Sequence, residues 1–193
     1  RHIPRWGIVV AMLVALIAAH LGAAVTIAAP NRAPAQATLA ATLPTETCSV
    51  SGPSERTCEL WAKSGSLTLP DAVSVPIWGY SGTVDGVASS PGPTLVAIEG
   101  ETLHIILHND LAEATSLTLG AQEVVPDVAG VAPGGTKIYT FPALAPGTHL
   151  YEAGAAPSGA RQVAMGLYGA LVVRPAANTA WAYGDDSAFD DEA

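Results

Sequence analysis

TLHIILHN, residues 102–109, is the stretch that decides the fold. Positions 103, 105 and 107 are all leucine or isoleucine, whereas His104, Ile106 and His108 occupy the alternate positions. In an extended chain, side chains two residues apart share a face. The stretch therefore predicts a β-strand that turns one face toward a hydrophobic core.

The pattern of this strand continues along the chain in both directions. From Cys48 to Pro175, short runs of Val, Ile, Leu, Thr and Tyr alternate with clusters of Gly, Pro, Asp and Ser. Further strands are predicted at residues 59–69, 73–80, 94–98, 136–141, 148–151 and 167–173. No long amphipathic helix is expected after residue 47. The pattern is typical of an antiparallel all-β sandwich or barrel, so we expect one folded domain at residues 48–175.

The size and charge of the chain limit what it can do. Its 193 residues, of which 49% are hydrophobic and only 13% are charged, have room for one ordinary core. The net charge of −9 repels phosphate backbones, so we expect no nucleic acid partner. Acidic side chains gather at the end of the chain, and we interpret residues 176–193 as an acidic linker or tail.

The N-terminal segment, residues 1–29, predicts an apolar helix. Residues 6–29 are almost wholly apolar and follow the basic residues Arg1 and Arg5. Their length suits a transmembrane anchor, since about 20 apolar residues span a bilayer. Alanines at positions 33, 35 and 37 suit instead the cleavage of a signal peptide, and both alternatives stay open.

Either alternative places the rest of the chain outside the cytoplasm, because basic residues that precede an apolar segment stay on the cytoplasmic side. We therefore expect a secreted, periplasmic or cell-surface protein that contacts the membrane through residues 6–29. Residues 30–47 are rich in Ala, Thr and Pro and have no hydrophobic period, so they are predicted to form an extended tether.

Two cysteines stand at the start of the predicted domain. Cys48 and Cys58 flank Gly52 and Pro53, a pair typical of a turn. In an exported chain we expect these cysteines to form a disulfide that closes a hairpin. A metal site is the weaker alternative, since a zinc or blue-copper site also needs histidines at suitable spacing.

Several sequence blocks follow one another in an order that resembles a known family. They are PGPTL (91–95), EGET (99–102), HNDL (108–111), VAPGGT (131–136), PGTHLY (146–151) and MGLYGALVV (165–173). Over roughly residues 58–175 the chain resembles the N-terminal, plastocyanin-like (cupredoxin) domain of multicopper oxidases. The resemblance implies a cupredoxin-like Greek-key β-sandwich and a family of copper-dependent oxidoreductases.

The resemblance fails at the positions where the family holds copper. In that family, two His-x-His pairs of this domain help to bind a copper cluster shared with another domain. The corresponding positions in this chain hold Thr118 and Gly120 for the first pair, and Glu152 and Gly154 for the second. Threonine and glycine offer no imidazole nitrogen, so we expect no copper site and no catalytic residue in this segment.

The remaining histidines of the predicted domain do not replace the missing pairs. His104 and His108 lie four residues apart on a strand, about 13 Å from each other, which is too far to share one metal ion. His149 is an isolated candidate beside Tyr151 and Glu152.

Two hypotheses about function follow. In the first, the segment is the structural first domain of a multicopper oxidase-like exported protein, and residues 181–193 resemble the connection to a second domain. Copper and any oxidase chemistry are then expected in further cupredoxin domains beyond Ala193. In the second, the segment is a non-catalytic, membrane-anchored β-sandwich that binds a partner or acts as a spacer.

Overall fold

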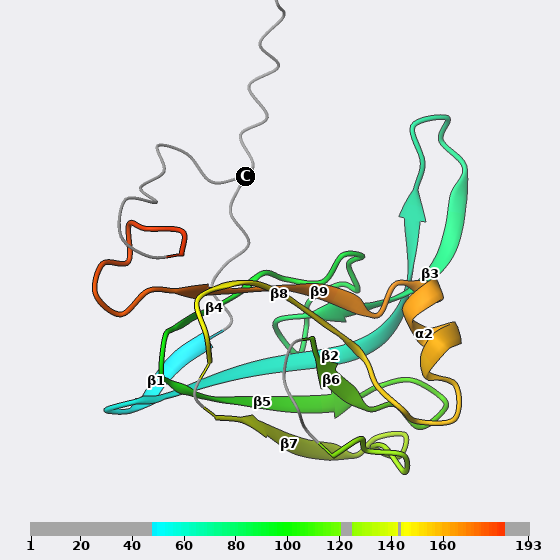
Figure 1. Cartoon of the computed structure of the whole chain (residues 1–193). Helices are drawn as coiled ribbons and strands as arrows, with labels where there is room; N and C mark the ends of the chain where they lie inside the picture. The colour runs from blue at the N-terminus through cyan, green and yellow to red at the C-terminus, as the bar shows by residue number, and fades with distance from the viewer. Residues whose placement is uncertain (1–47, 121–124, 143, 184–193) are drawn as a thin grey trace, which may run out of the picture. The chain divides into compact units, whose positions relative to one another are not determined.

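Two β-sheets form the part of the chain that the computed structural model describes, which is residues 48–120, 125–142 and 144–183 (Figure 1). The first sheet has the strand order β1-β2-β5-β7, and β3 pairs with β2 beside this path. Its strands are β1 (Cys48–Gly52), β2 (Glu55–Thr68), β3 (Ser74–Ser81), β5 (Thr102–Asn109) and β7 (Thr136–Phe141). The second sheet has the order β4-β9-β8-β6. Its strands are β4 (Leu95–Ile98), β6 (Leu117–Leu119), β8 (Gly147–Ala153) and β9 (Tyr168–Arg174).

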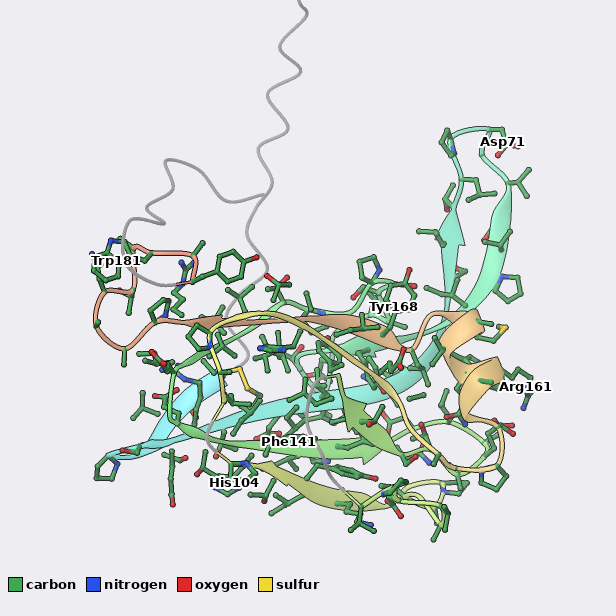
Figure 2. The ribbon with its side chains drawn as sticks, viewed as in Figure 1. Asp71, His104, Phe141, Arg161, Tyr168 and Trp181 are labelled. Carbon is green, nitrogen blue, oxygen red and sulfur yellow. A yellow bond between two sulfur atoms is a disulfide. The ribbon has the colours of Figure 1, made fainter. Side chains whose placement is uncertain are left out.

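Strand β5 confirms the prediction made from its alternating residues. It pairs with β2 in parallel and with β7 in antiparallel orientation, so it lies inside the first sheet. Leu103, Ile105 and Leu107 are fully buried, whereas His104 and His108 lie on the opposite, partly exposed face. Figure 2 shows His104 on that outer face and Phe141 between the two sheets.

The core is formed by the inner faces of both sheets. Its largest fully buried side chains are Tyr80, Tyr151, Phe141, Leu60, Leu95, Leu103, Ile105, Leu107, Leu119, Leu144, Leu167 and Leu171. Because both sheets contribute to one contiguous cluster, the described domain is an all-β sandwich as predicted. Its strands are not all antiparallel as expected, since β2 pairs with β5 and β4 pairs with β9 in parallel.

The predicted disulfide is present. Cys48 and Cys58 face each other in the β1–β2 register, with their Cα atoms 4.0 Å apart. Cys58 is fully buried, so the bridge ties the first strand to the core. The turn between the strands follows Gly52, as the sequence predicts.

Two elements differ from the prediction. A helix, α2, occupies Gly159–Met165, where no helix was expected from the sequence pattern. A helix of seven residues is too short to display a helical period of apolar residues. Strands β2 and β3 extend as a two-stranded arm beyond the sandwich, with Asp71 at its tip (Figure 2). The arm exposes Leu67, Leu69 and Val73.

The predicted apolar helix of residues 1–29, the tether of residues 30–47 and most of the predicted acidic tail lie outside the described residues. Within the described ranges, no helix is long and apolar enough to cross a membrane. The last strand, β9, ends at Arg174, one residue before the predicted domain boundary.

Candidate functional site

The positions where the resemblance implies copper ligands lie together on two neighbouring strands. Thr118 of β6 and Glu152 of β8 are direct partners in the antiparallel register. The backbone N–H of Gly120 donates to Leu150 O at 2.7 Å, and that of Gly154 donates to Ser116 O at 2.9 Å. The four positions therefore lie along the β6–β8 pair, with Thr118 opposite Glu152 near its middle and Gly120 and Gly154 at its two ends.

The groups at these positions do not match a copper cluster held by imidazoles. Their side chains supply one hydroxyl and one carboxylate, while Gly120 and Gly154 supply none. A Cβ atom at Gly154 would lie 2.8 Å from Ser116 Oγ, and one at Gly120 would lie 3.3 Å from Leu150 O. A histidine side chain at position 154 would therefore require a neighbour to shift. Among the described residues, no group of three or more His, Cys, Asp or Glu side chains could hold a metal ion.

The predicted isolated histidine does not join this site. Burial alternates along β8, and His149 and Glu152 belong to opposite faces of the strand. The His149 ring instead contacts Ala145 O through Nε2 at 2.9 Å.

The other two histidines lie on the outer face of the first sheet. His108 stacks on the Trp61 ring with the ring centroids 4.4 Å apart, and its Nε2 is 3.2 Å from Glu59 Oε2. His104 Nδ1 is 3.1 Å from Thr140 Oγ1. Both histidines have partners in the sheet surface, and neither reaches the positions on β6 and β8.

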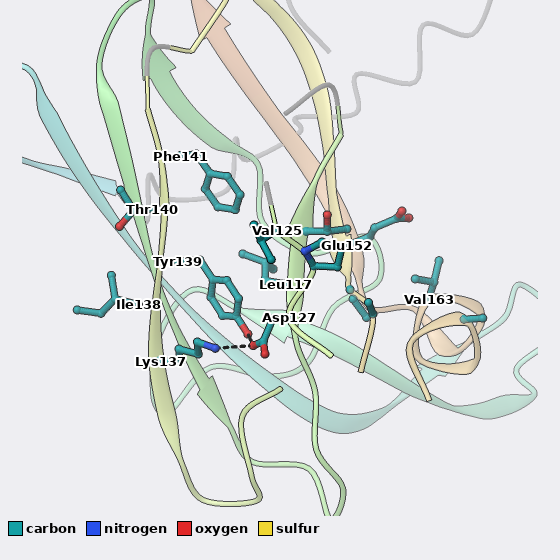
Figure 3. A pocket seen from close by; sticks show the side chains of 16 residues that line it. Leu117, Val125, Asp127, Lys137, Ile138, Tyr139, Thr140, Phe141, Glu152 and Val163 are labelled. Atoms are coloured by element: carbon teal, nitrogen blue, oxygen red, sulfur yellow. Dashed lines mark hydrogen bonds and ion pairs between the residues drawn. The ribbon is translucent and has the colours of Figure 1, made fainter. Parts of the chain in front are cut away.

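A pocket of about 730 Å³ adjoins the β6–β8 pair (Figure 3). Its walls come from β6, β7, β8, α2 and the segment that precedes β7. The lining residues are Leu117, Thr118, Val125, Pro126, Asp127, Lys137, Ile138, Tyr139, Thr140, Phe141, Glu152, Ala153, Gly154, Ala155, Ala160 and Val163. Three of the four predicted positions therefore lie in the pocket wall.

The Asp127 carboxylate in the pocket wall accepts hydrogen bonds through both of its oxygens. Asp127 Oδ2 accepts hydrogen bonds from Lys137 Nζ at 2.7 Å and from Tyr139 Oη at 2.6 Å, and Oδ1 accepts from the Gly130 N–H at 3.0 Å. Partial burial raises the pKa of Asp127, but these hydrogen bonds outweigh it and lower the pKa from 3.8 to about 2. Burial, followed by the hydrogen bond to Asp127, raises the pKa of Tyr139.

A buried network of polar side chains lies beside the pocket, and no pattern in the sequence predicted it. Gln162 of α2 is fully buried, and its Oε1 accepts a hydrogen bond from Thr115 Oγ1 at 2.7 Å. Its Nε2 donates to Glu113 Oε1 and to Ala114 O, both at 2.9 Å. Arg161, next to it on α2, forms an ion pair with Glu113 and lies over the Trp78 ring. The network fastens α2 to the segment before β6.

These features define a cupredoxin-like domain. Two β-sheets share one core, and the strand order in each sheet differs from the order along the chain. The solved multicopper oxidase of Pseudomonas thermotolerans has the same fold, with a TM-score of 0.54 and 29% sequence identity. That similarity covers 63% of this chain and 30% of the other.

The chain belongs to the multicopper oxidase family, because the family model described as multicopper oxidase matches residues 63–178, more than half of its length. The copper-containing nitrite reductase of Neisseria meningitidis serogroup B is 28% identical over 115 residues, which are 57% of this chain and 28% of the reductase. Laccase ustL of Ustilaginoidea virens is 35% identical over 96 residues, which are 44% of this chain and 14% of the laccase. The chain thus spans less than a third of the length of each relative.

Proposed function

We propose that this segment is the structural first cupredoxin domain of an exported multicopper oxidase-like protein and binds no copper in the manner of the family. Further cupredoxin domains of the same protein would then hold the copper and carry out any oxidase chemistry. The observation that carries the proposal is that Thr118, Gly120, Glu152 and Gly154 occupy the positions at which the resemblance implies four imidazole ligands.

The local packing supports the proposal. The backbone N–H groups of Gly120 and Gly154 donate hydrogen bonds across the β6–β8 pair. Ser116 fills the space beside Gly154. Ser116 is itself buried, and its Oγ accepts a hydrogen bond from the Ala156 N–H at 3.0 Å. A side chain at position 154 would therefore collide with the buried Ser116 hydroxyl, which argues against an imidazole at that position.

Export is supported by two features of the chain. Residues 6–29 suit either an anchor or a signal peptide. The Cys48–Cys58 disulfide suits an oxidising compartment, because thiols remain reduced in the cytosol. We propose that the domain lies outside the cytoplasm, attached to the membrane if residues 6–29 are retained.

The second candidate function is a non-catalytic, anchored sandwich that binds a partner or acts as a spacer. The β2–β3 arm favours it, since the arm carries the exposed apolar residues Leu67, Leu69 and Val73. An isolated two-stranded hairpin is only marginally stable in water, so such an arm would gain stability from a covering surface.

Copper titration of the purified chain tests the proposal. We expect no blue absorbance band and no stoichiometric tight binding when Cu²⁺ is added and the bound metal is counted after dialysis. A Glu152→Gln variant should take up the same small amount of copper as the original chain. A blue band, or one tightly bound copper that Glu152→Gln removes, would contradict the proposed structural role.

A further inference from the structure

The arm formed by β2 and β3 leaves one edge of β2 without a neighbouring strand. Strand β5 pairs with β2 only as far as Ala62, where the Asp110 N–H donates to Ala62 O at 2.9 Å. Beyond this point the arm reaches past the sandwich, and every residue from 64 to 74 is exposed (Figure 2). A two-stranded sheet is marginally stable in water, and three or more strands are needed for independent stability. The arm would therefore gain stability from a further strand.

The register of the arm decides which backbone groups of β2 face outward. The Leu69 N–H donates to Val73 O at 2.8 Å, so this pair and every second pair below it exchange hydrogen bonds within the arm. The pairs between them point their N–H and C=O groups away from the partner strand. On β2 these outward residues are Ser64, Ser66 and Thr68, whose backbone groups have no hydrogen-bond partner in the described part of the chain.

The opposite edge of the arm is closed to pairing. The outward positions of β3 include Pro76 and Tyr80. Pro76 has no N–H to donate, and Tyr80 exchanges backbone hydrogen bonds with Ser89. Proline on an exposed edge is a common means of preventing the addition of a strand. Residues 64–68 of β2 contain neither proline nor a charged side chain, so the β2 edge is the one that can accept a strand.

We propose that the β2 edge pairs with the same edge of a second copy of this chain, which joins the two arms into a four-stranded sheet about a two-fold axis. Strands related in this way run antiparallel. Ser66 of one copy would lie opposite Ser66 of the other, and Ser64 opposite Thr68, so that all outward groups exchange hydrogen bonds. On the outer face, Leu67 of each copy would lie opposite Gly65 of the other, where the absence of a side chain leaves room for it.

Charge favours a second copy as the occupant of this edge. The net charge of −9 makes two copies repel each other over most of their surfaces. Asp71 is the one charged residue between positions 64 and 78, and it lies in the turn beyond the strand pair. Pairing of the arms therefore places no like charges opposite each other, which would destabilise a strand pair. The inference rests on the second candidate function, for which it names the partner.

Sedimentation equilibrium of the intact chain tests the inference, in a detergent that keeps residues 6–29 dispersed. We expect a reversible dimer. Ser66→Pro removes the central donor of the new pairing but no hydrogen bond of the arm itself, because the Ser66 N–H faces outward. It should weaken the dimer at least about tenfold. Ser74→Pro is the matched control, since it removes an outward donor from the β3 edge and should leave the dimer unchanged.

A second pair of variants avoids any disturbance of the arm by proline. Ser66→Cys would place the two new thiols beside the two-fold axis, with about 5.5 Å between their Cα atoms, which suits a disulfide. Mild oxidation should link the copies covalently, as seen from a dimer band in non-reducing electrophoresis. Ser74→Cys, an equally exposed change on β3, should remain monomeric under the same conditions.

Three results would overturn the inference. They are an intact chain that stays monomeric at millimolar concentration, a dimer that Ser66→Pro and Ser74→Pro affect equally, and equal cross-linking of Ser66→Cys and Ser74→Cys. Copper uptake, which tests the proposed function, is measured on the same samples and does not depend on the dimer. Failure of this inference and failure of the proposed function are therefore distinguishable.

Discussion

Thr115 Oγ1 donates a hydrogen bond of 2.7 Å to Gln162 Oε1, and both residues are fully buried although 47 positions separate them in the chain. The bond joins α2 to the segment that leads into β6, and therefore holds one end of the candidate site in place. A buried polar pair of this kind is stabilising only while every member keeps its partner.

Replacement of Gln162 tests this relationship. Gln162→Leu keeps a similar volume but leaves Thr115 Oγ1 and Ala114 O without their partner. We expect the free energy of unfolding, measured by urea denaturation, to fall by about 2 to 4 kcal/mol. Arg161→Ala, which removes a half-exposed ion pair on the same helix, should cost only about 0.5 to 1 kcal/mol.

The double variant Thr115→Val/Gln162→Leu completes the cycle. The free energy of unfolding should fall by about 1 kcal/mol less in the double variant than the sum of the losses for Thr115→Val and Gln162→Leu alone. The reason is that Gln162→Leu already leaves the Thr115 hydroxyl unpaired, and Thr115→Val removes that hydroxyl. Strictly additive losses would show that the two side chains are not coupled.

Two buried tyrosines are predicted to respond differently to loss of their hydroxyl groups. Tyr151 Oη donates to Pro93 O at 2.6 Å, whereas Tyr80 Oη is buried and has no hydrogen-bond partner among the described residues. Tyr151→Phe should lower the free energy of unfolding by about 1 to 2 kcal/mol, and Tyr80→Phe should leave it unchanged within about 0.5 kcal/mol or raise it. Thermal unfolding of both variants checks this, and a larger loss for Tyr80→Phe would contradict the assignment.

The pH dependence of stability reports on Asp127. Folding lowers the pKa of this carboxyl from 3.8 to about 2, so its contribution to stability is fully present above about pH 4 and is lost as the pH falls toward 2. Its partner Lys137 is half exposed, and we expect a contribution of about 1 to 2 kcal/mol after screening.

Asp127→Asn should therefore flatten the stability profile between pH 4 and pH 2, as measured by urea midpoints. Asp71→Asn, at the tip of the arm, changes the same charge away from the pocket and should leave the shape of the profile intact. Profiles of equal slope for the original chain and Asp127→Asn would show that the Asp127 interactions do not stabilise the fold.

The Cys48–Cys58 disulfide is expected to stabilise the domain by constraining the unfolded chain. The cysteines lie 10 positions apart, and loop entropy for so short a ring predicts about 2 to 3 kcal/mol. The double variant Cys48→Ala/Cys58→Ala should lose this amount in denaturation experiments, and reductant should destabilise only the original chain. Two titratable thiols in the denatured, unreduced protein would rule out the bridge.

The sequence predicted most of the strands because their information is local. The alternation in residues 102–109 and the turn between Cys48 and Cys58 each depend on a few neighbouring residues, and the structure confirms both. Of the four positions at which the resemblance implies copper ligands, Thr118 and Glu152 pair across β6 and β8, and Gly120 and Gly154 directly follow these strands.

The remaining features depend on contacts between distant segments. Helix α2 is short and bounded by Gly159 and Gly166, so no periodic signal marks it. The burial of Gln162 and the pocket beside Phe141 arise only when α2 packs against the two sheet edges. No pattern within a short window of sequence encodes such packing.

The central claim is that the β6–β8 site holds no copper, and a crystal of the chain soaked in Cu²⁺ tests it most directly. The anomalous scattering of copper, measured at its absorption edge, locates any bound ion. Our account predicts no anomalous peak within bonding distance of Thr118 or Glu152. An ordered peak coordinated by the Glu152 carboxylate, at an occupancy near one, would contradict it.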